Sequence, residues 1–107
     1  MKAILRKTQA QEPFSFVFLN SQGKTLLKSE NYKAKDSALN GITSVKKNCP
    51  NDTRYDLKES KNGKFFFNIK AANGQIIGTS PLFSTQSERD TAIGQLKGEG
   101  AKATLEA

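Results

Sequence analysis

The chain has 107 residues, of which 17 are lysine or arginine and 10 are aspartate or glutamate, so its formal net charge is +7. A chain of this length forms one domain, because two separate domains of about 50 residues would each bury too little surface. The absence of histidine removes the commonest general base, and a single cysteine excludes an internal disulfide and a thiolate metal site. We therefore expect a non-enzymatic protein without a metal or cofactor.

The amino-terminal segment has only three consecutive apolar residues, Ala3 to Leu5. This run is far too short for a signal peptide or a membrane span. We therefore expect a cytoplasmic protein that does not contact a membrane. Residues 2–6 are predicted to form a short first strand, and residues 7–13 a polar loop.

Alternating aromatic residues predict a second strand over Phe14–Leu19. The turn Asn20–Gly23 follows, and Lys24–Ser29 is predicted as the return strand. Over residues 35–48 the apolar residues recur at steps of three and four. This spacing predicts a helix with one face on a core, and Pro50 ends it.

The second half of the chain repeats this order of elements. Thr53–Lys58 is predicted as a strand, and the turn Lys61–Lys64 leads into an aromatic strand that begins at Phe65. Asn73-Gly74 predicts a two-residue hairpin, because both residue types tolerate a positive φ. The strand Gln75–Ser80 should then return antiparallel.

The second predicted helix begins with a capping-box spacing, in which Thr85 is followed three residues later by Glu88. The hydroxyl and the carboxylate can each satisfy an amide that the helix start leaves unpaired. The equivalent residue of the first helix is Ala34, which offers no cap. Gly98 and Gly100 are predicted to end the second helix.

An offset of 51 residues aligns the two halves without a gap from Phe14 onward. With a last strand over residues 101–106, each repeat has the order β-β-β-α(-β), with approximate bounds 2–51 and 53–107. We predict an α+β fold, one domain over residues 1–107, in which both repeats share one antiparallel sheet with two helices packed on it. Whether the terminal strands cross between the two repeats is left open by the sequence. A chain that holds both repeats is expected to be a monomer. The residues predicted to lie at equivalent core positions are Phe14, Phe16, Phe65 and Phe67.

Several short motifs are specific to this pair of repeats. In the second repeat they are Asn62–Phe66 and Lys70–Ile77, and in the first repeat they are Tyr32, Ala38, Asn40–Ile42 and Ser44–Asn48. This combination resembles the YegP-like family of small bacterial tandem-repeat proteins of unknown function. The resemblance implies the tandem fold described above, and it implies no activity, cofactor or functional residue.

The positive charge is concentrated in the first repeat. Residues 1–51 hold nine basic and three acidic residues, a net +6, whereas residues 52–107 hold eight and seven, a net +1. Such a basic surface can bind phosphates by counterion release. We hypothesise a non-catalytic binding module for an anionic partner, either nucleic acid or an acidic protein. The candidate anion-binding residues are Lys24, Lys28, Lys33, Lys35, Lys46 and Lys47.

Two alternatives remain open beside this hypothesis. Basic and aromatic residues are interleaved over Gly63–Phe67, as in sheets that stack bases, but the order of elements differs from that fold. Phe65 and Phe67 are therefore assigned to the core, and Phe66 is the candidate exposed aromatic. The chain could instead be a protein–protein interaction module that acts through a sheet edge or the sheet face, with its basicity serving only solubility.

A catalytic function is the weakest interpretation. Cys49 follows the first predicted helix and has no histidine to activate it, so it is interpreted as a small buried hydrophobic residue. The densest acidic group is Asp52, Asp56 and Glu59. Asp56 alternates with apolar strand residues and is expected to face water rather than to form a catalytic pair.

Overall fold

The structure is a computed structural model that describes residues 1–106, and its elements follow the predicted repeat order. Short 3₁₀ helices, Asp52–Arg54 and Gly100–Lys102, precede the fourth and seventh strands. The main elements are β1 (Lys2–Lys7), β2 (Phe14–Leu19), β3 (Thr25–Lys28), α1 (Lys35–Asn48), β4 (Tyr55–Glu59), β5 (Phe65–Lys70), β6 (Ile76–Thr79), α2 (Gln86–Glu99) and β7 (Thr104–Glu106).

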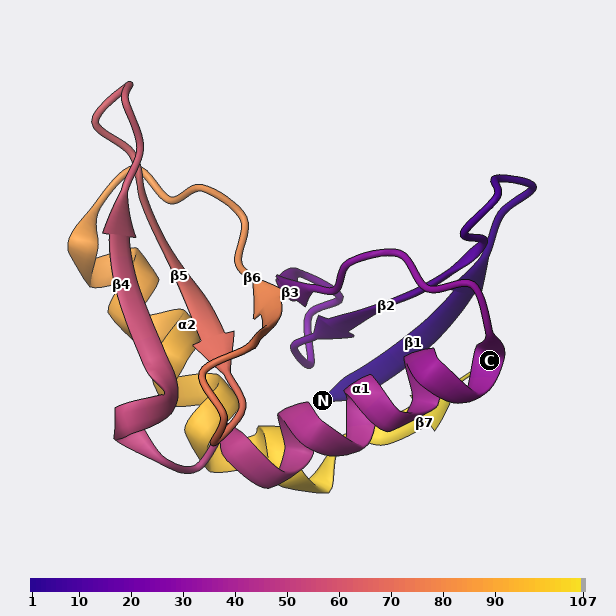
Figure 1. Ribbon diagram of the computed structural model, residues 1–107. Helices are drawn as coiled ribbons and strands as arrows, with labels where there is room; N and C mark the ends of the chain where they lie inside the picture. The colour runs from indigo at the N-terminus through magenta and orange to yellow at the C-terminus, as the bar shows by residue number, and fades with distance from the viewer. Residues whose placement is uncertain (107) are drawn as a thin grey trace.

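All seven strands form one sheet in the order β4-β5-β6-β3-β2-β1-β7. Figure 1 shows the sheet as two arms, one from each repeat, that meet where β3 and β6 pair antiparallel. Each helix begins beside its own arm and ends below the junction, where the 3₁₀ turn after α2 contacts α1. The α+β prediction, with one shared sheet and two helices, is confirmed.

The last strand corrects the prediction of a wholly antiparallel sheet. β7 belongs to the second repeat but pairs with β1 of the first, and this pair is parallel, with Lys2 opposite Thr104. The backbone N–H of Thr104 donates to the carbonyl of Met1 at 3.0 Å. The strand is parallel because α2 ends below the junction, near the start of β1, and the chain then runs along β1 in the same direction.

The predicted two-residue hairpin at Asn73-Gly74 is wrong. The N–H of Ala71 donates to the carbonyl of Gln75, and the N–H of Gly74 donates to the carbonyl of Ala71, both at 2.9 Å, so the loop holds three residues. Within this loop only Gly74 has a positive φ, of 87°. This three-residue loop places one residue in the left-handed region next to a β-bulge, and that residue is ordinarily glycine. The turn at Asn20 has the same hydrogen bonds, so the two repeats turn alike.

Several predicted element boundaries shift, and the largest shift is at β7, which begins at Thr104 rather than at residue 101 because residues 100–102 form a 3₁₀ turn. The side chain of Asn51 accepts a hydrogen bond from the N–H of Thr53, which folds residues 52–54 into a 3₁₀ turn, and β4 therefore begins at Tyr55. Gly98 does not end α2, which continues to Glu99. A glycine weakens a helix by lowering its propensity but does not break its hydrogen bonds.

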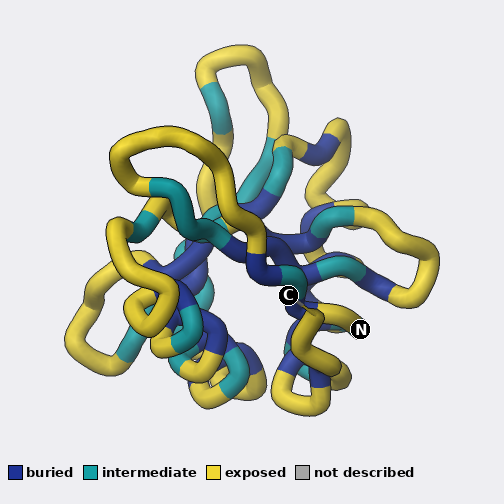
Figure 2. The backbone as a smooth tube through the Cα atoms, turned by 90° about the vertical axis from the view of Figure 1, so that its right-hand side faces the viewer, coloured by how far each residue is buried: buried dark blue, intermediate teal, exposed yellow. Residues whose placement is uncertain are grey.

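The core lies between the sheet and the helices, where the buried segments gather in Figure 2 while the hairpin tips stay exposed. Phe14 and Phe65, predicted as core residues, are only partly buried, because each begins its strand near a sheet end. Phe16 and Phe67 are fully buried, as predicted. The largest fully buried side chains are Phe16, Phe18, Leu26, Leu27, Val45, Cys49, Phe67, Ile69 and Leu96.

The helix starts differ as the sequence predicts. The Thr85 hydroxyl accepts a hydrogen bond from the N–H of Glu88 at 3.1 Å, whereas Ala34 has no cap bond. The capping box is only half formed, because the Glu88 carboxylate accepts from the Thr85 hydroxyl at 3.2 Å instead of from the backbone N–H of Thr85.

Candidate anion-binding site

Three cationic side chains surround a hollow of about 330 Å³ at the end of β1. Arg6 and Lys7 come from the last residues of β1, and Lys35 is the first residue of α1. Leu5 and Phe14 supply the apolar lining between them. We call this hollow, with its five lining residues, the basic groove.

Backbone pairing brings these separate segments together. Lys7 lies opposite Phe14 in the β1–β2 ladder, and its Nζ is 5.7 Å from the centre of the Phe14 ring. Phe14 also exchanges two backbone hydrogen bonds with Tyr32, of 3.0 and 2.6 Å. This second pairing holds the segment before α1 against β2, so α1 begins beside the ring with Lys35.

The cations of the basic groove are exposed and unneutralised. Arg6, Lys7 and Lys35 take part in none of the ion pairs found among residues 1–106. Of those four ion pairs, only Lys2–Glu106 involves a basic residue of the first repeat. The positive charge of the basic groove is therefore not neutralised by an ion pair within residues 1–106.

The cation beside Phe65, the residue equivalent to Phe14, is neutralised. Arg89 lies over the Phe65 ring, with its guanidinium carbon 5.7 Å from the ring centre. Arg89 is buried, however, and its Nε donates to the carboxylate of Asp90 at 3.2 Å. A buried and paired guanidinium offers little to a solvent anion, so the two repeats differ in electrostatics although they share a fold.

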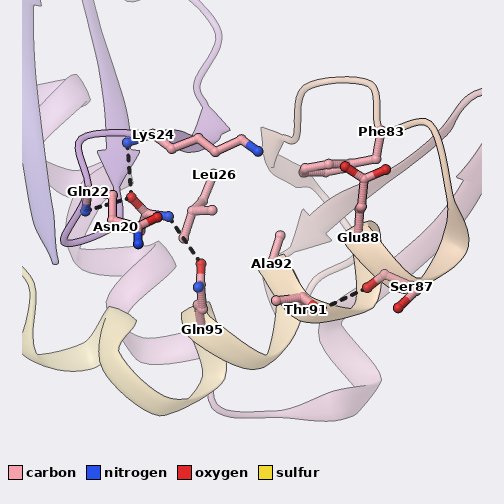
Figure 3. Close-up of a pocket in the computed structure, with 10 residues that line it drawn as sticks. All are labelled: Asn20, Gln22, Lys24, Leu26, Phe83, Ser87, Glu88, Thr91, Ala92 and Gln95. Atoms are coloured by element: carbon pink, nitrogen blue, oxygen red, sulfur yellow. Dashed lines mark hydrogen bonds between the residues drawn. The ribbon is translucent and has the colours of Figure 1, made fainter.

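A second hollow, of about 260 Å³, lies between the β2–β3 hairpin and α2 (Figure 3). The Asn20 amide oxygen accepts from the backbone N–H groups of Gln22 and Lys24, and its amide nitrogen donates to Gln95 at 3.4 Å. These bonds fix the hairpin to the helix. Glu88 lies on the opposite side from Lys24, so the hollow has groups of both charges and favours neither sign of ligand.

Two members of the acidic group singled out in the sequence are paired with lysines. Asp52 is paired with Lys97 of α2, and Asp56 is paired with Lys58 at 3.4 Å. Asp56 is partly buried rather than fully exposed. No cluster of three acidic or cysteine side chains that could hold a metal ion occurs within residues 1–106.

The family profile for a domain of unknown function, DUF1508, matches residues 10–56 and again residues 60–106. The chain belongs to the DUF1508 family. The two matches cover most of the chain, one for each half, and they confirm the resemblance to YegP-like tandem repeats. The UPF0339 protein YegP of Escherichia coli strain K12 is 47% identical over 92 residues, which cover 86% of this chain and 84% of that protein.

Two solved structures extend the comparison to the fold. The solution NMR structure of the protein of unknown function yegP from E. coli has a TM-score of 0.90 at 43% identity, covering 98% of this chain and 90% of that chain. The UPF0339 protein of Shewanella oneidensis has a TM-score of 0.91 at 40% identity, covering 98% and 88%. This DUF1508 chain therefore shares its whole fold with bacterial relatives.

The structure divides the six lysines predicted in the first DUF1508 repeat. Lys24 and Lys28 line a hollow of about 390 Å³ with Glu88 and residues 81–84. Lys35 instead joins the basic groove. Lys33 and Lys47 are exposed. Sequence reasoning missed Arg6 and Lys7, because their place beside Phe14 depends on the β1–β2 register.

Lys46 has a structural contact that the sequence does not reveal. Its Nζ donates to the carbonyl of Ala103 at 3.1 Å, immediately before β7. It therefore helps to hold the crossing strand of the DUF1508 fold. A variant at Lys46 would disturb this contact as well as the surface charge, so it is a poor probe of anion binding.

The remaining predicted residues lie as follows. Phe66 is partly buried rather than exposed. Cys49 is fully buried, and burial raises the pKa of its thiol to about 11. Burial also raises the pKa of Tyr55, whose hydroxyl donates to the Cys49 carbonyl at 2.6 Å. Within residues 1–106, no helix of this DUF1508 protein is long and apolar enough to span a membrane.

Proposed function

We propose that this protein is a non-catalytic binding module for nucleic acid and that the basic groove is its contact surface. The observation that carries the proposal is the set of exposed cations Arg6, Lys7 and Lys35 around the partly buried ring of Phe14. None of these three cations takes part in an ion pair within residues 1–106. Lysine and arginine side chains bind phosphates, and an aromatic ring at the same place provides a surface for a base.

The groove supports a single strand better than a duplex. Base stacking requires unpaired bases, and a contact with only a few phosphates suits a short single-stranded segment. Neutralising three phosphates of a single strand gives a slope of about −2 for the logarithm of affinity against the logarithm of salt concentration. The affinity should then fall roughly twentyfold between about 50 and 200 mM salt.

The test is a fluorescence-anisotropy titration of labelled single-stranded RNA and DNA and of duplex DNA at both salt concentrations. The variant Lys7→Glu/Lys35→Glu should abolish binding, because both residues line the groove. The matched control is Lys61→Glu/Lys64→Glu, which changes the net charge equally in the β4–β5 turn of the second repeat. Circular dichroism should show that both variants remain folded.

The outcomes separate three interpretations. Binding that both double variants weaken equally reflects net charge alone and contradicts a local site. No binding of any nucleic acid at low salt also refutes the proposal. An acidic protein would contact the same cations, so polyglutamate is titrated in parallel. Tighter binding of polyglutamate than of RNA would assign the groove to an acidic protein.

A further inference from the structure

The outer edge of β4 has no neighbouring strand among the described residues, since β4 ends the strand order of the sheet. Figure 1 shows β4 on the outside of its arm. The equivalent strand of the first repeat, β1, is covered by β7. The difference is visible in two equivalent leucines, because Leu5 on β1 is 8% exposed whereas Leu57 on β4 is 54% exposed.

The hydrogen bonds of the neighbouring turn fix which backbone groups of β4 point outward. The N–H of Ser60 donates to the carbonyl of Lys64 at 2.7 Å, so Ser60 faces its partner across the hairpin. The backbone of Phe65, opposite Glu59, instead exchanges its hydrogen bonds with Phe83 on its other side. Alternation along an antiparallel strand then directs the N–H and C=O groups of Tyr55, Leu57 and Glu59 away from β5.

We propose that a second copy of this chain pairs with β4, antiparallel, across a twofold axis through Leu57. This register places Leu57 opposite Leu57 of the second copy, and Tyr55 opposite Glu59. All three positions have outward backbone groups, so each pair in this register exchanges two hydrogen bonds. The two seven-stranded sheets thereby become one continuous sheet.

The charges on the other face of β4 are self-complementary in the same register. Asp56 of one copy lies opposite Lys58 of the other, and the twofold axis repeats the pair. Within one chain these residues already form an ion pair of 3.4 Å on the same face. A lysine in an edge strand ordinarily discourages strand pairing, but not where an acidic residue faces it.

The rest of the surface favours this contact between like chains. The second repeat has a net charge of only +1, so two copies that meet through β4 keep their +6 halves at the far ends. A hollow of about 300 Å³ beside Leu57, lined in part by Ile93 and Gly94, offers apolar surface to the leucine of the second copy. One strand edge buries less than a standard interface, so we expect a weak dimer, with a dissociation constant on the order of 10⁻⁵ to 10⁻³ M.

Sedimentation velocity over a range of concentrations tests the proposal, with exchange of the charges as the decisive variant. Asp56→Lys alone places two lysines opposite each other, and Lys58→Asp alone places two aspartates opposite each other. Each single change should weaken dimerisation about tenfold. The double variant Asp56→Lys/Lys58→Asp restores opposite charges across the axis and should restore dimerisation. Even partial recovery of dimerisation in the double variant, compared with both single variants, identifies pairing of β4 with β4 of the second copy.

A second variant uses the backbone directly. Leu57→Pro removes an outward N–H and leaves the ladder with β5 unchanged, so it should abolish the dimer in a folded monomer, as checked by circular dichroism. A wild-type protein that is monomeric at millimolar concentration overturns the proposal, as does a double variant no better than the single ones. These results are independent of nucleic-acid binding, since Leu57 lies outside the basic groove.

Discussion

Replacement of Gly41 by alanine tests how closely α1 approaches the first arm of the sheet. A Cβ atom at Gly41 would lie 2.8 Å from the Phe16 ring and 2.8 Å from the hydroxyl oxygen of Tyr32. Real Cβ atoms do not approach neighbours this closely, so either the ring or the helix must move. The equivalent residue of the second repeat is Ala92, whose environment contains Phe83 where the first repeat has Tyr32.

The expected magnitude follows from two opposing terms. Alanine has a helix propensity about 1 kcal/mol more favourable than that of glycine. Overpacking of a close contact opposes it by about 1 to 3 kcal/mol. Gly41→Ala should therefore lower the free energy of unfolding by about 1 kcal/mol. Gly94→Ala should raise it by about 0.5 to 1 kcal/mol, because a Cβ at Gly94 in α2 meets nothing within 4 Å.

The double variant Tyr32→Phe/Gly41→Ala reproduces the phenylalanine and alanine pair of the second repeat. Removing the Tyr32 hydroxyl opens the space that the new methyl group needs. The two changes should therefore couple favourably, by about 1 kcal/mol in a double-mutant cycle. Phe16 limits the relief, since its ring stays in contact.

Urea denaturation at low micromolar protein concentration measures Gly41→Ala, Gly94→Ala, the single variant Tyr32→Phe and the double variant against the wild type. Additivity of the Tyr32 and Gly41 changes would refute the assigned role of the hydroxyl. A stabilised Gly41→Ala, similar to Gly94→Ala, would refute the close approach of α1 altogether. Unchanged slopes against urea would show that the variants alter stability rather than the denatured state.

Three further predictions use the same assay. Phe16→Ala should lower the free energy of unfolding by about 3 to 5 kcal/mol and Phe14→Ala by about 1 to 2 kcal/mol, because only Phe16 is fully buried; equal losses would contradict this. Thr85→Ala should cost about 1 kcal/mol by removing the helix cap, and Ala34→Thr should stabilise modestly; a stabilised Thr85→Ala would exclude the cap. Burial raises the pKa of the Cys49 thiol from 9.0 to about 11, so the folded state retains a proton that the unfolded chain loses. The free energy of unfolding should therefore fall as the pH rises from 9.0 to about 11, and it should fall less in Cys49→Ala. If the difference in this free energy between the two proteins does not change with pH, the buried thiol is refuted.

The repeat, the number of main strands and helices and the two helix spans could be predicted because they depend on local pattern. Alternation at Phe16 and Phe18 and the three- and four-residue spacing of α1 are properties of consecutive residues. Glycine positions also located three of the four hairpin turns, at Gly23, Gly63 and Gly74, whereas the β1–β2 loop has no glycine. The loop type escaped prediction, because Asn73-Gly74 suits both a two-residue turn and the last positions of a three-residue loop.

Features that depend on distant residues were not predictable from one sequence. The parallel pairing of β7 with β1 brings residues 2 and 104 together, and no local signal specifies that register. The contact of Lys46 with Ala103 follows from the same crossing. The basic groove likewise depends on the β1–β2 register and on the bridge between Phe14 and Tyr32, so charge counting pointed to the repeat that holds the groove but named only one of its three cations.

The two repeats share a fold but differ in their surfaces. Phe16 and Phe67 occupy equivalent, fully buried positions, so packing constrains the residue at this position in both repeats. The surfaces of the two repeats differ. β7 covers the edge of β1, whereas the equivalent edge of β4 has no neighbouring strand among the described residues. Charge divides along the same boundary, with the unpaired cations of the basic groove in one repeat and the paired Arg89 in the other. Under the two proposals above, a single sheet presents an anion-binding end on one arm and a strand-pairing end on the other, so a variant at either end should leave the other unaffected.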